Sequence, residues 1–436
     1  MAGLRVSSML DHHASLFPSY RRMTISRAEV IERAKVIAVV AARNASEAES
    51  LRRMPEENVQ AIMQSGLMPL LRPREFGGFE SDWLTHIDCV AEVARCCGST
   101  GWCMSFLIQH QFYLAYFPLA TQKFVYERSP DPKIVTSFAP TGKARKVKGG
   151  FELSGRWVFA SGVDHCDWAI VGGRVETDRG KAVGNFLLTP GQFRVDRVWN
   201  SVGLRGTGSN DLLVDEPIFV SEEFFYSQAD ALNGVAPGSL ALAGRLYRGP
   251  LAMNSGFGVM TAMHGIAQGA LEAFVSNTSG KVALMGTKNA AEFNDIQTAV
   301  GQSKGEIDLA HLLVAKMSAL AVVDRPISID DIVETRRDLI FLMKLLRGAV
   351  DRLFSFSGAR GLDQGQALQR HWRDIHAISH HFTFAMPSLQ TEGRRALGLG
   401  PADGDLIESF EWVERPDATR CASESTSVAS LQRAGS

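Results

Sequence analysis

The hydrophobic period of this chain changes twice, and that change limits the possible folds more than any other feature. Over residues 26–132 apolar residues recur every three to four positions, which is typical of amphipathic helices. Over 133–235 short runs of β-branched and aromatic residues alternate with Gly, Pro and Asp, which indicates strands and turns. The helical period returns over 239–400. This order predicts a helical N-terminal domain, a small central β-barrel or sandwich, and a C-terminal four-helix bundle.

Local signals refine these boundaries. Ser26 stands three residues before Glu29, the spacing of a capping box, so we expect a helix to begin there. Gly149-Gly150 predicts a hairpin turn. The β runs are Phe151–Leu153, Trp157–Phe159, Trp168–Val171, Asn185–Thr189, Phe193–Val195, Leu212–Val214 and Ile218–Val220. The four bundle helices are predicted over Pro250–Ser276, Ala290–Val323, Asp330–Phe356 and Ala367–Met386.

The two ends of the chain differ from the rest. Residues 1–25 read as a flexible leader that carries charges and lacks the apolar run of a secretory signal. Residues 413–436 are rich in Ser, Ala and Thr with almost no large apolar side chains, so we expect a disordered tail.

Bulk composition excludes several classes of protein. The 46 basic and 47 acidic residues give a net charge of −1, which argues against a nucleic-acid binder with a basic face. The least charged window, Gly249–Leu271, is long enough for a membrane span but too polar. None of the six cysteines forms a C-x-x-C pair. We therefore expect reduced thiols and a cytoplasmic protein without nucleic-acid or membrane partners.

Three short stretches contain candidate site residues that do not belong to the apolar core patterns. They are Gly155–Gly162, Gly203–Asp211 and Arg370–His381. The first two fall on β segments and the third on a helix, which indicates a site where domains meet. Arg370 and Arg373 are expected to form ion pairs, with Asp374 as one candidate partner. The set favours a flavin over a metal or a nucleophile.

A metal site has only an incomplete ligand set. His376 and His380 are four residues apart on a predicted helix and can face one ion. No glutamate completes an H-E-x-x-H motif and no third ligand is apparent. We therefore predict no metal.

The order and spacing of the motifs carry a family resemblance. Thr136–Ala144, Ser154–Trp157, Ser161-Gly162 and His165–Trp168 follow one another in this order. The set resembles the oxygenase component of two-component flavin-dependent (group D) aromatic monooxygenases, which have an acyl-CoA dehydrogenase-like fold. The resemblance implies hydroxylation of a phenolic or fused aromatic small molecule through a flavin C4a-hydroperoxide. It implies reduced FMN or FAD, with the choice left open, and O2.

One departure separates the chain from true acyl-CoA dehydrogenases. Their catalytic glutamate follows the Arg-Asp motif of the last bundle helix, where this chain has His381-Phe382. The alternative position, on the first bundle helix, falls near Ser255, where no carboxylate stands. Neither phenylalanine nor serine can deprotonate a carbon acid at neutral pH. We therefore expect the scaffold without the dehydrogenase chemistry.

The resemblance also assigns roles to particular residues. Ser161 matches the residue beside flavin N5, although a Ser-Gly pair also serves simple turns. His110 and His381 are the acid–base candidates, each of which can equally be a structural histidine, and His380 is not separated from His381. Phe138, Ala139, Thr141, Trp157 and Ser161 match residues that line the flavin. Trp102, Phe106, His110 and Phe112 are expected to form the substrate pocket.

A glycine-rich loop at the end of the third bundle helix is the last such feature. Ser357 and Gly358 match a loop that reaches the flavin phosphates from a neighbouring subunit, which implies a homotetramer. Gly358 also suits a helix C-cap. Trp199 and Arg205 are expected either to flank the entrance of the site or to be structural.

The source of reduced flavin must lie outside the chain. Gly203–Gly208 lacks the spacing of a dinucleotide fingerprint, so a separate NAD(P)H:flavin reductase is implied as a partner. Three other functions stay open at this point. They are oxygenation at nitrogen or sulfur on the same scaffold, an acyl-CoA dehydrogenase with a displaced base, and a non-catalytic flavin-binding homologue.

Overall fold

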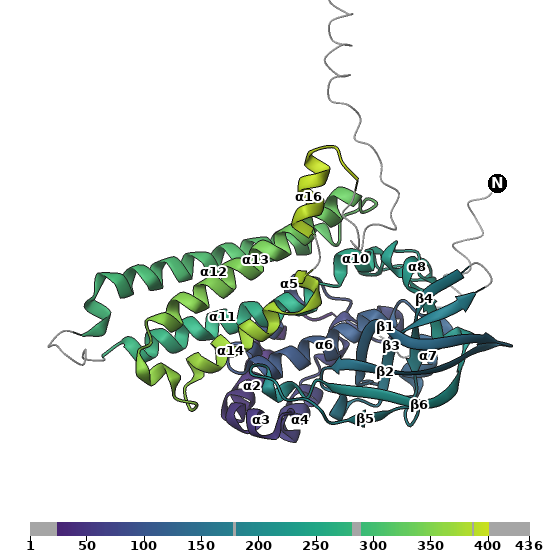
Figure 1. Ribbon diagram of the computed structural model, residues 1–436, viewed down its shortest axis with the longest axis horizontal. Coiled ribbons are helices and arrows are strands. Elements are labelled where there is room, and N and C mark those ends of the chain that lie inside the picture. Colours follow the sequence, from purple (N-terminus) through teal and green to yellow (C-terminus); the bar gives the residue numbers. More distant parts are fainter. Residues whose placement is uncertain (1–23, 178–179, 281–288, 386–387, 401–436) are drawn as a thin grey trace, which may run out of the picture.

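The computed structural model describes residues 24–177, 180–280, 289–385 and 388–400 (Figure 1). Almost all of the predicted leader over 1–25, and the whole of the predicted tail over 413–436, lie outside the described residues. Within the described ranges, no helix has both the length and the apolar character needed to cross a membrane.

The N-terminal region is helical, as predicted. Ser26 accepts a hydrogen bond from the backbone N–H of Glu29 at 3.2 Å, which confirms the predicted helix start. Every residue of helix α6 except Phe106 is buried, and Figure 1 shows this helix between the bundle and the sheet. The helices of this region are α2 (Arg27–Arg43), α3 (Ala45–Leu51), α4 (Glu56–Gln64), α5 (Trp83–Ala94), α6 (Gly98–Leu114) and α7 (Leu119–Arg128).

The central domain is one continuous seven-stranded sheet in the order β5-β6-β2-β1-β3-β4-β7. Neighbouring strands are antiparallel except β1 and β3, which run parallel. The strands are β1 (Ile134–Val147), β2 (Gly150–Ala160), β3 (Trp168–Thr177), β4 (Gly180–Leu188), β5 (Arg194–Asp196), β6 (Asn210–Ser221) and β7 (Phe225–Ser227).

Two differences from the predicted strands have a common cause. Strands β2 and β6 each join two of the predicted runs, and β1 covers a segment without a predicted run. Backbone pairing with neighbours continues through polar residues such as Lys143 and Arg145, which carry no apolar signal. The predicted hairpin is present, with its turn at Lys148-Gly149, one residue earlier than expected. Gly149 adopts φ +78°, a conformation that favours glycine.

The C-terminal bundle contains the four predicted long segments, but two of them are broken. The first breaks at Ser255-Gly256, where a side-chain carbon on Gly256 would lie 2.6 Å from the Leu339 side chain. The last breaks at His380-His381. The main helices here are α10 (Leu251–Asn254), α11 (Phe257–Thr278), α12 (Asn294–Leu320), α13 (Ile329–Ser355), α14 (Ala367–Ser379), α15 (Phe382–Ala385) and α16 (Ser388–Ala396).

Candidate active site

A row of aromatic side chains along helix α6 forms the centre of the site. Trp102, Phe106 and His110 are spaced by four residues and so share one helix face. Their ring centroids lie 4.9 Å apart between Trp102 and Phe106 and 5.5 Å apart between Phe106 and His110. His381 continues the row with its ring 5.8 Å from that of Trp102. We call these four residues the aromatic row; it has a histidine at each end.

His110 is fixed as a hydrogen-bond acceptor at one end of the row. Its Nδ1 lies 2.5 Å from the carbonyl oxygen of Ile134, and because a carbonyl only accepts, Nδ1 carries the proton. Nε2 is then the acceptor for the Thr136 hydroxyl at 2.9 Å. Burial lowers the pKa of His110 to about 4. The ring is therefore neutral at neutral pH.

His381 has the opposite arrangement at the other end. The backbone N–H of Thr383 donates to His381 Nδ1 at 3.3 Å, and the Thr383 hydroxyl lies 2.9 Å from the same nitrogen. Nδ1 is thus an acceptor, and the proton is on Nε2. Burial lowers the pKa of His381 to about 4. The neutral ring presents an N–H group.

The break after α14 separates the two adjacent histidines. His380 is exposed, and its Nδ1 lies 2.9 Å from the carbonyl oxygen of His376. His381 instead turns against the ring of Trp102. The structure therefore places His381, and not His380, in the aromatic row.

Ser161 joins the β domain to the row. The Trp102 indole N–H donates to the Ser161 hydroxyl at 2.9 Å. The Ser161 oxygen lies 2.8 Å from that of Ser209, which lies 2.7 Å from that of Thr207. Ser209 and Thr207 belong to the Gly203–Asp211 motif, but their hydroxyls were not singled out from the sequence.

The loop that carries these hydroxyls lies where the three regions meet. The buried Asp374 carboxylate on α14 accepts the backbone N–H of Leu204 at 2.6 Å. The backbone N–H of Gly206 donates to the Ser99 hydroxyl on α6 at 3.1 Å. Burial raises the pKa of Asp374 to about 6. The bundle and α6 therefore both fix the position of the Ser161 partners.

The two α14 arginines form ion pairs, as predicted, but with Glu49 and not with the candidate partner Asp374. Arg370 and Arg373 both pair with Glu49 on α3, at 3.3 and 2.6 Å. Asp374 points to Leu204 because it lies on the face of α14 that is buried against the loop. The sequence gives no sign of Glu49 because this residue is far away along the chain.

The predicted flavin-lining residues divide into two groups. Phe138 lies on β1 with its ring 4.9 Å from that of Tyr113, whose ring in turn lies 5.8 Å from that of His110. Ala139 and Thr141 are exposed on the same strand. Trp157 is fully buried in the core of the β domain, and its indole N–H donates to the carbonyl of Gly172 at 2.6 Å. The structure thus brings Phe138 near the row and keeps the Trp157 ring inside the sheet domain.

Phe112, the remaining predicted pocket residue, lies apart from the row. Its ring is 4.9 Å from that of Trp83 and 5.8 Å from that of Tyr247. It is completely buried in the helical core. This position follows from its place on α6, two residues after His110 and so on another face of the helix.

Sequence reasoning missed Phe159. This side chain is 69% exposed although it is large and apolar, and its backbone adopts φ +59°, a strained conformation for a bulky residue. The register of β2 against β6 shifts at this point. Phe159 meets Trp199 edge-on at 6.3 Å. Phe159 is thus an exposed aromatic side chain two residues before Ser161.

Trp199 and Arg205, which were expected to flank the entrance, each donate a hydrogen bond to a backbone carbonyl. The Trp199 indole N–H donates to the Leu204 carbonyl at 3.1 Å, and Arg205 donates to the Ser201 carbonyl at 3.1 Å. Trp199 also meets the exposed Phe159, and Arg205 bonds within its own loop.

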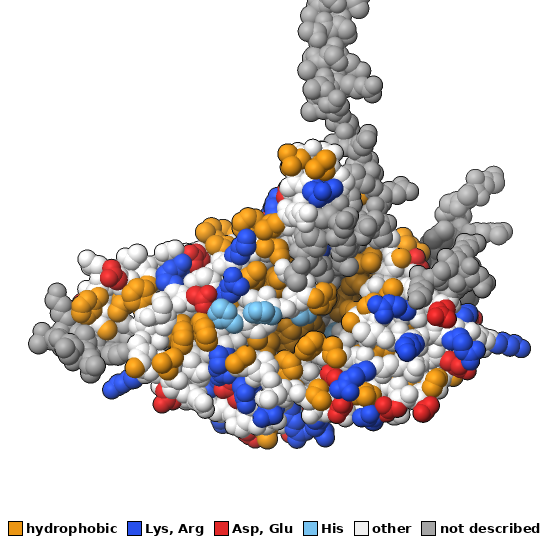
Figure 2. Space-filling view, viewed as in Figure 1, with side chains coloured by type: hydrophobic (Ala, Val, Ile, Leu, Met, Phe, Trp, Pro, Cys, Tyr) orange, Lys and Arg blue, Asp and Glu red, His pale blue; other side chains and the backbone are white. Residues whose placement is uncertain are grey.

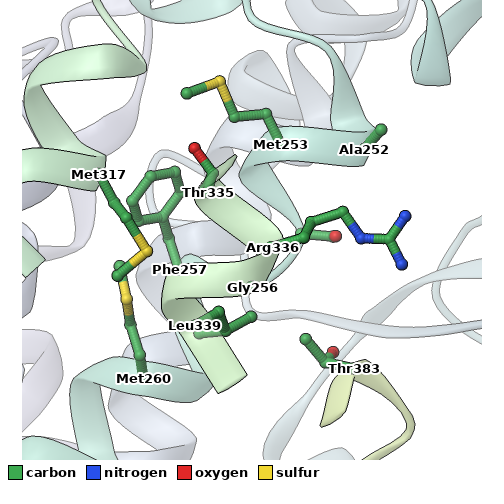
Figure 3. A pocket seen from close by; sticks show the side chains of 11 residues that line it. Ala252, Met253, Gly256, Phe257, Met260, Met317, Thr335, Arg336, Leu339 and Thr383 are labelled. Carbon is green, nitrogen blue, oxygen red and sulfur yellow. The ribbon is translucent and has the colours of Figure 1, made fainter. Parts of the chain in front are cut away.

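A small cavity lies between α10, α11 and α13 and next to Thr383 (Figure 3). Thr383, the residue bonded to His381, lines it together with Ser255 and Arg336. None of its lining residues carries a carboxylate. Its volume is about 10 Å³, room for roughly one water molecule.

The Gly358 loop lies at the surface. Gly358 is exposed and adopts φ +67°. The apolar side chains of Phe356 and Leu362 on either side are 41% and 70% exposed. Ser357 donates its hydroxyl to the Phe354 carbonyl at 2.7 Å.

Histidine side chains gather over α14 beside hydrophobic ones in Figure 2. Within the described ranges, however, no group of three or more His, Cys, Asp and Glu side chains is arranged to hold a metal ion. His376 instead pairs with Asp351 at 2.7 Å.

Comparisons with known proteins agree with this geometry. Residues 31–123 match the acyl-CoA dehydrogenase N-terminal domain, and residues 257–386 match the acyl-CoA dehydrogenase C-terminal domain. A crystal structure of 3-HSA hydroxylase from Rhodococcus sp. RHA1 superposes with a TM-score of 0.81 at 32% identity, covering 86% of this chain and 98% of that one. The acyl-CoA dehydrogenase-like fold is therefore confirmed.

Two curated relatives identify the branch of this fold. The oxygenase subunit HsaA of a flavin-dependent monooxygenase from Rhodococcus jostii is 34% identical over 77% of this chain and 90% of its own. The oxygenase component of an FADH2-dependent resorcinol hydroxylase from a Rhizobium species is 32% identical over 82% and 91%. The chain belongs to the oxygenase components of the two-component flavin-dependent aromatic monooxygenases.

Proposed function

We propose that this oxygenase component hydroxylates a small phenolic or fused aromatic compound bound along the aromatic row. The observation that carries the proposal is the opposite protonation of the two terminal histidines. Nε2 of His110 is an acceptor that is occupied by the Thr136 hydroxyl, whereas Nε2 of His381 carries an N–H group. A phenol donates from its hydroxyl and develops negative charge on its oxygen during attack, so it needs an acceptor and a donor at different places.

His110 polarises the hydroxyl group of the substrate but does not remove its proton. Its pKa of about 4 lies about six units below that of a phenol, which is about 10. Full transfer to His110 is therefore strongly uphill. A hydrogen bond from the substrate through the Thr136 hydroxyl to Nε2 polarises the phenol and makes its ring more electron-rich.

His381 supplies the donor. Because Thr383 occupies Nδ1, the Nε2–H group is held in one tautomer before substrate arrives. A preorganised donor in a water-poor site stabilises developing negative charge more than a mobile one does.

The flavin binds beside Ser161 in this proposal. Ser161 faces N5, and Phe138, Ala139 and Thr141 of β1 line the ring system. Bound reduced flavin supplies the activation of O2. The exposed aromatic side chain of Phe159, two residues before Ser161, supports this placement.

A second copy of the chain completes the phosphate end. The Ser357-Gly358 loop is exposed between two exposed apolar side chains, as expected of a segment that is covered in an oligomer. We infer a homotetramer in which this loop reaches the flavin of a neighbouring subunit.

An oxygenase component receives its flavin from a separate reductase, and we infer that this partner is an NAD(P)H:flavin reductase. We place both proteins in the cytoplasm. The five described cysteines are free thiols, as expected in a reducing compartment.

Product analysis with a supplied reductase tests the proposal. The chain, NAD(P)H, FMN or FAD and O2 are incubated with resorcinol, p-hydroxyphenylacetate and indole-3-acetate, the compounds named for its relatives. We expect an oxygen-dependent hydroxylated product, lost in His110→Asn and kept in His380→Ala. Equal product from both variants would remove His110 from the reaction. Reduction of bound FAD by an acyl-CoA would overturn the hydroxylase assignment.

A further inference from the structure

The hydroxyls beside Ser161 form an ordered chain. Ser161 contacts Ser209 at 2.8 Å, Ser209 contacts Thr207 at 2.7 Å, and the Thr207 hydroxyl lies 2.9 Å from the carbonyl oxygen of Leu204. We call Ser161, Ser209 and Thr207 the hydroxyl relay. Thr207 is fully buried and Ser209 is 6% exposed, so bulk water does not compete for either hydroxyl.

Counting protons fixes the direction of the relay. Its three hydroxyls have three protons to share among three oxygen–oxygen contacts. The last contact ends at a carbonyl, which has no proton to give. Each hydroxyl must therefore donate toward Leu204: Ser161 to Ser209, Ser209 to Thr207, and Thr207 to the carbonyl.

The reverse order is unfavourable. It would leave the Thr207 oxygen facing the Leu204 carbonyl oxygen at 2.9 Å without a hydrogen between them. The carbonyl is also held in place, because Asp374 accepts the Leu204 N–H at 2.6 Å and Leu204 adopts φ +51°. The Leu204 end of the relay is thus a fixed acceptor.

In this donor order, the hydroxyl proton of Ser161 is already used in the hydrogen bond to Ser209. One lone pair of the Ser161 oxygen accepts the Trp102 indole N–H at 2.9 Å, and its own proton is directed to Ser209. One lone pair of the Ser161 oxygen then remains for a further donor. Ser161 can therefore only accept a further hydrogen bond.

We propose that Ser209 and Thr207 are positioning residues that hold the Ser161 hydroxyl as an acceptor, and that this selects reduced over oxidised flavin. Reduced flavin carries a hydrogen on N5, whereas oxidised flavin has a bare acceptor nitrogen there. A Ser161 oxygen that can only accept a hydrogen bond binds the N5–H group of reduced flavin and repels the bare N5 of oxidised flavin. This inference rests on the proposed placement of flavin N5 beside Ser161.

Anaerobic binding of both redox forms tests the relay. The measured quantity is the ratio of the dissociation constants of oxidised and reduced FMN or FAD, checked by the midpoint potential of the bound flavin. In Ser209→Ala the Ser161 proton is released and can turn to oxidised N5. We expect the ratio to fall about tenfold, the scale of one hydrogen bond, which lowers the midpoint potential by about 30 mV for two electrons.

Thr207→Val distinguishes the relay from a general packing effect. Without the Thr207 oxygen, Ser209 can donate to Ser161, and the Ser161 proton then points into the site. We expect a larger fall in the ratio than in Ser209→Ala, although Val keeps the shape of Thr. Trp102→Phe removes a donor from Ser161 but leaves the relay order intact, so the preference for reduced flavin should persist.

Ser105→Ala is the matched control. Ser105 is also a buried hydroxyl that contacts a threonine hydroxyl, Thr261, at 2.8 Å and donates to a carbonyl, that of Gly258, at 2.9 Å. It lies outside the relay, and its variant should keep the wild-type ratio.

The possible outcomes separate the two proposals. Wild-type ratios in both Ser209→Ala and Thr207→Val, each folded by thermal unfolding, overturn the relay. If Ser161→Ala also leaves the ratio and the potential unchanged, the placement of N5 beside Ser161 fails instead, and with it the flavin site of the proposed function.

Discussion

The two ends of the proposed flavin site are held in contrasting ways. At the Ser161 end, buried partners from α6, the sheet domain and α14 fix each polar group within one chain. At the Gly358 end the backbone is left-handed and exposed, between exposed apolar side chains. In the proposed arrangement, contacts within one chain preorganise the reacting end, whereas we infer that the phosphate end requires a second copy.

The largest effect is expected at the preorganised end. His110→Ala removes the acceptor bonded to Thr136 and should lower the rate of hydroxylation about 100-fold or more, the usual scale for an acid–base group. The affinity for reduced flavin should stay within about twofold because His110 lies at the substrate side of the row. Single-turnover kinetics measures the first and anaerobic titration the second. A parallel loss of both would contradict the separation of substrate and flavin contacts.

Asp374 should give this end a pH-dependent stability. Its pKa is raised to about 6 in the folded state, above about 3.9 in unfolded chains, so the folded protein binds more protons between these values. The stability contribution of Asp374 is thus present below about pH 4 and is lost as pH rises through 6. The amide of Asp374→Asn does not titrate, so the variant does not lose this contribution. Its free energy of unfolding minus that of the wild type should therefore rise by up to ~3 kcal/mol from pH 4 to pH 7.

Denaturant unfolding of both proteins at pH 4 to 7 measures this difference. A difference in unfolding free energy that does not change with pH would show that Asp374 does not titrate in the folded protein over this range. The amide oxygen of Asn can still accept the Leu204 N–H group, so the relay itself is kept.

Coupling of oxygen use to hydroxylation should depend on Ser161. Ser161→Ala removes the acceptor beside N5 and should raise the peroxide released per reduced flavin consumed by about tenfold, the scale of one hydrogen bond. Ser105→Ala removes a comparable buried hydroxyl outside the site and should not change the peroxide yield. Unchanged coupling in Ser161→Ala would remove this residue from the reaction.

The smallest effect is expected at the exposed end. Gly358→Ala adds a side chain that meets nothing within 4 Å but strains the φ +67° backbone. We expect flavin affinity to fall about fivefold, equivalent to ~1 kcal/mol of strain. Gly348→Ala, in the middle of α13 where an added side chain also meets nothing within 4 Å, is the control and should have no effect. An unchanged affinity in Gly358→Ala would leave the loop without a role.

The sequence predicts the parts of the fold that depend on local patterns. Amphipathic periodicity locates the long helices because each buries one face, and the Ser26 cap predicts the start of α2. The breaks in two bundle helices are not predictable in this way. One of them places Gly256 against Leu339, which is distant along the chain.

The site is predictable only where a motif carries it. Ser161, His110 and His381 follow from the family pattern, and the structure brings all three to the aromatic row. The hydroxyl relay and the Asp374 contact depend on long-range docking of one loop between α6 and α14. The strained Phe159 depends on a register shift in β2, for which the sequence gives no signal.

We propose that this chain uses reduced flavin to insert one atom of O2 into an aromatic ring. The decisive experiment is a single turnover of the chain with chemically reduced FMN or FAD, ¹⁸O2 and the three named aromatic compounds. We predict a product with one labelled oxygen atom, and peroxide that appears more slowly than from free reduced flavin. Recovery of all consumed oxygen as peroxide at the free-flavin rate, with both flavins and every compound, would contradict the account.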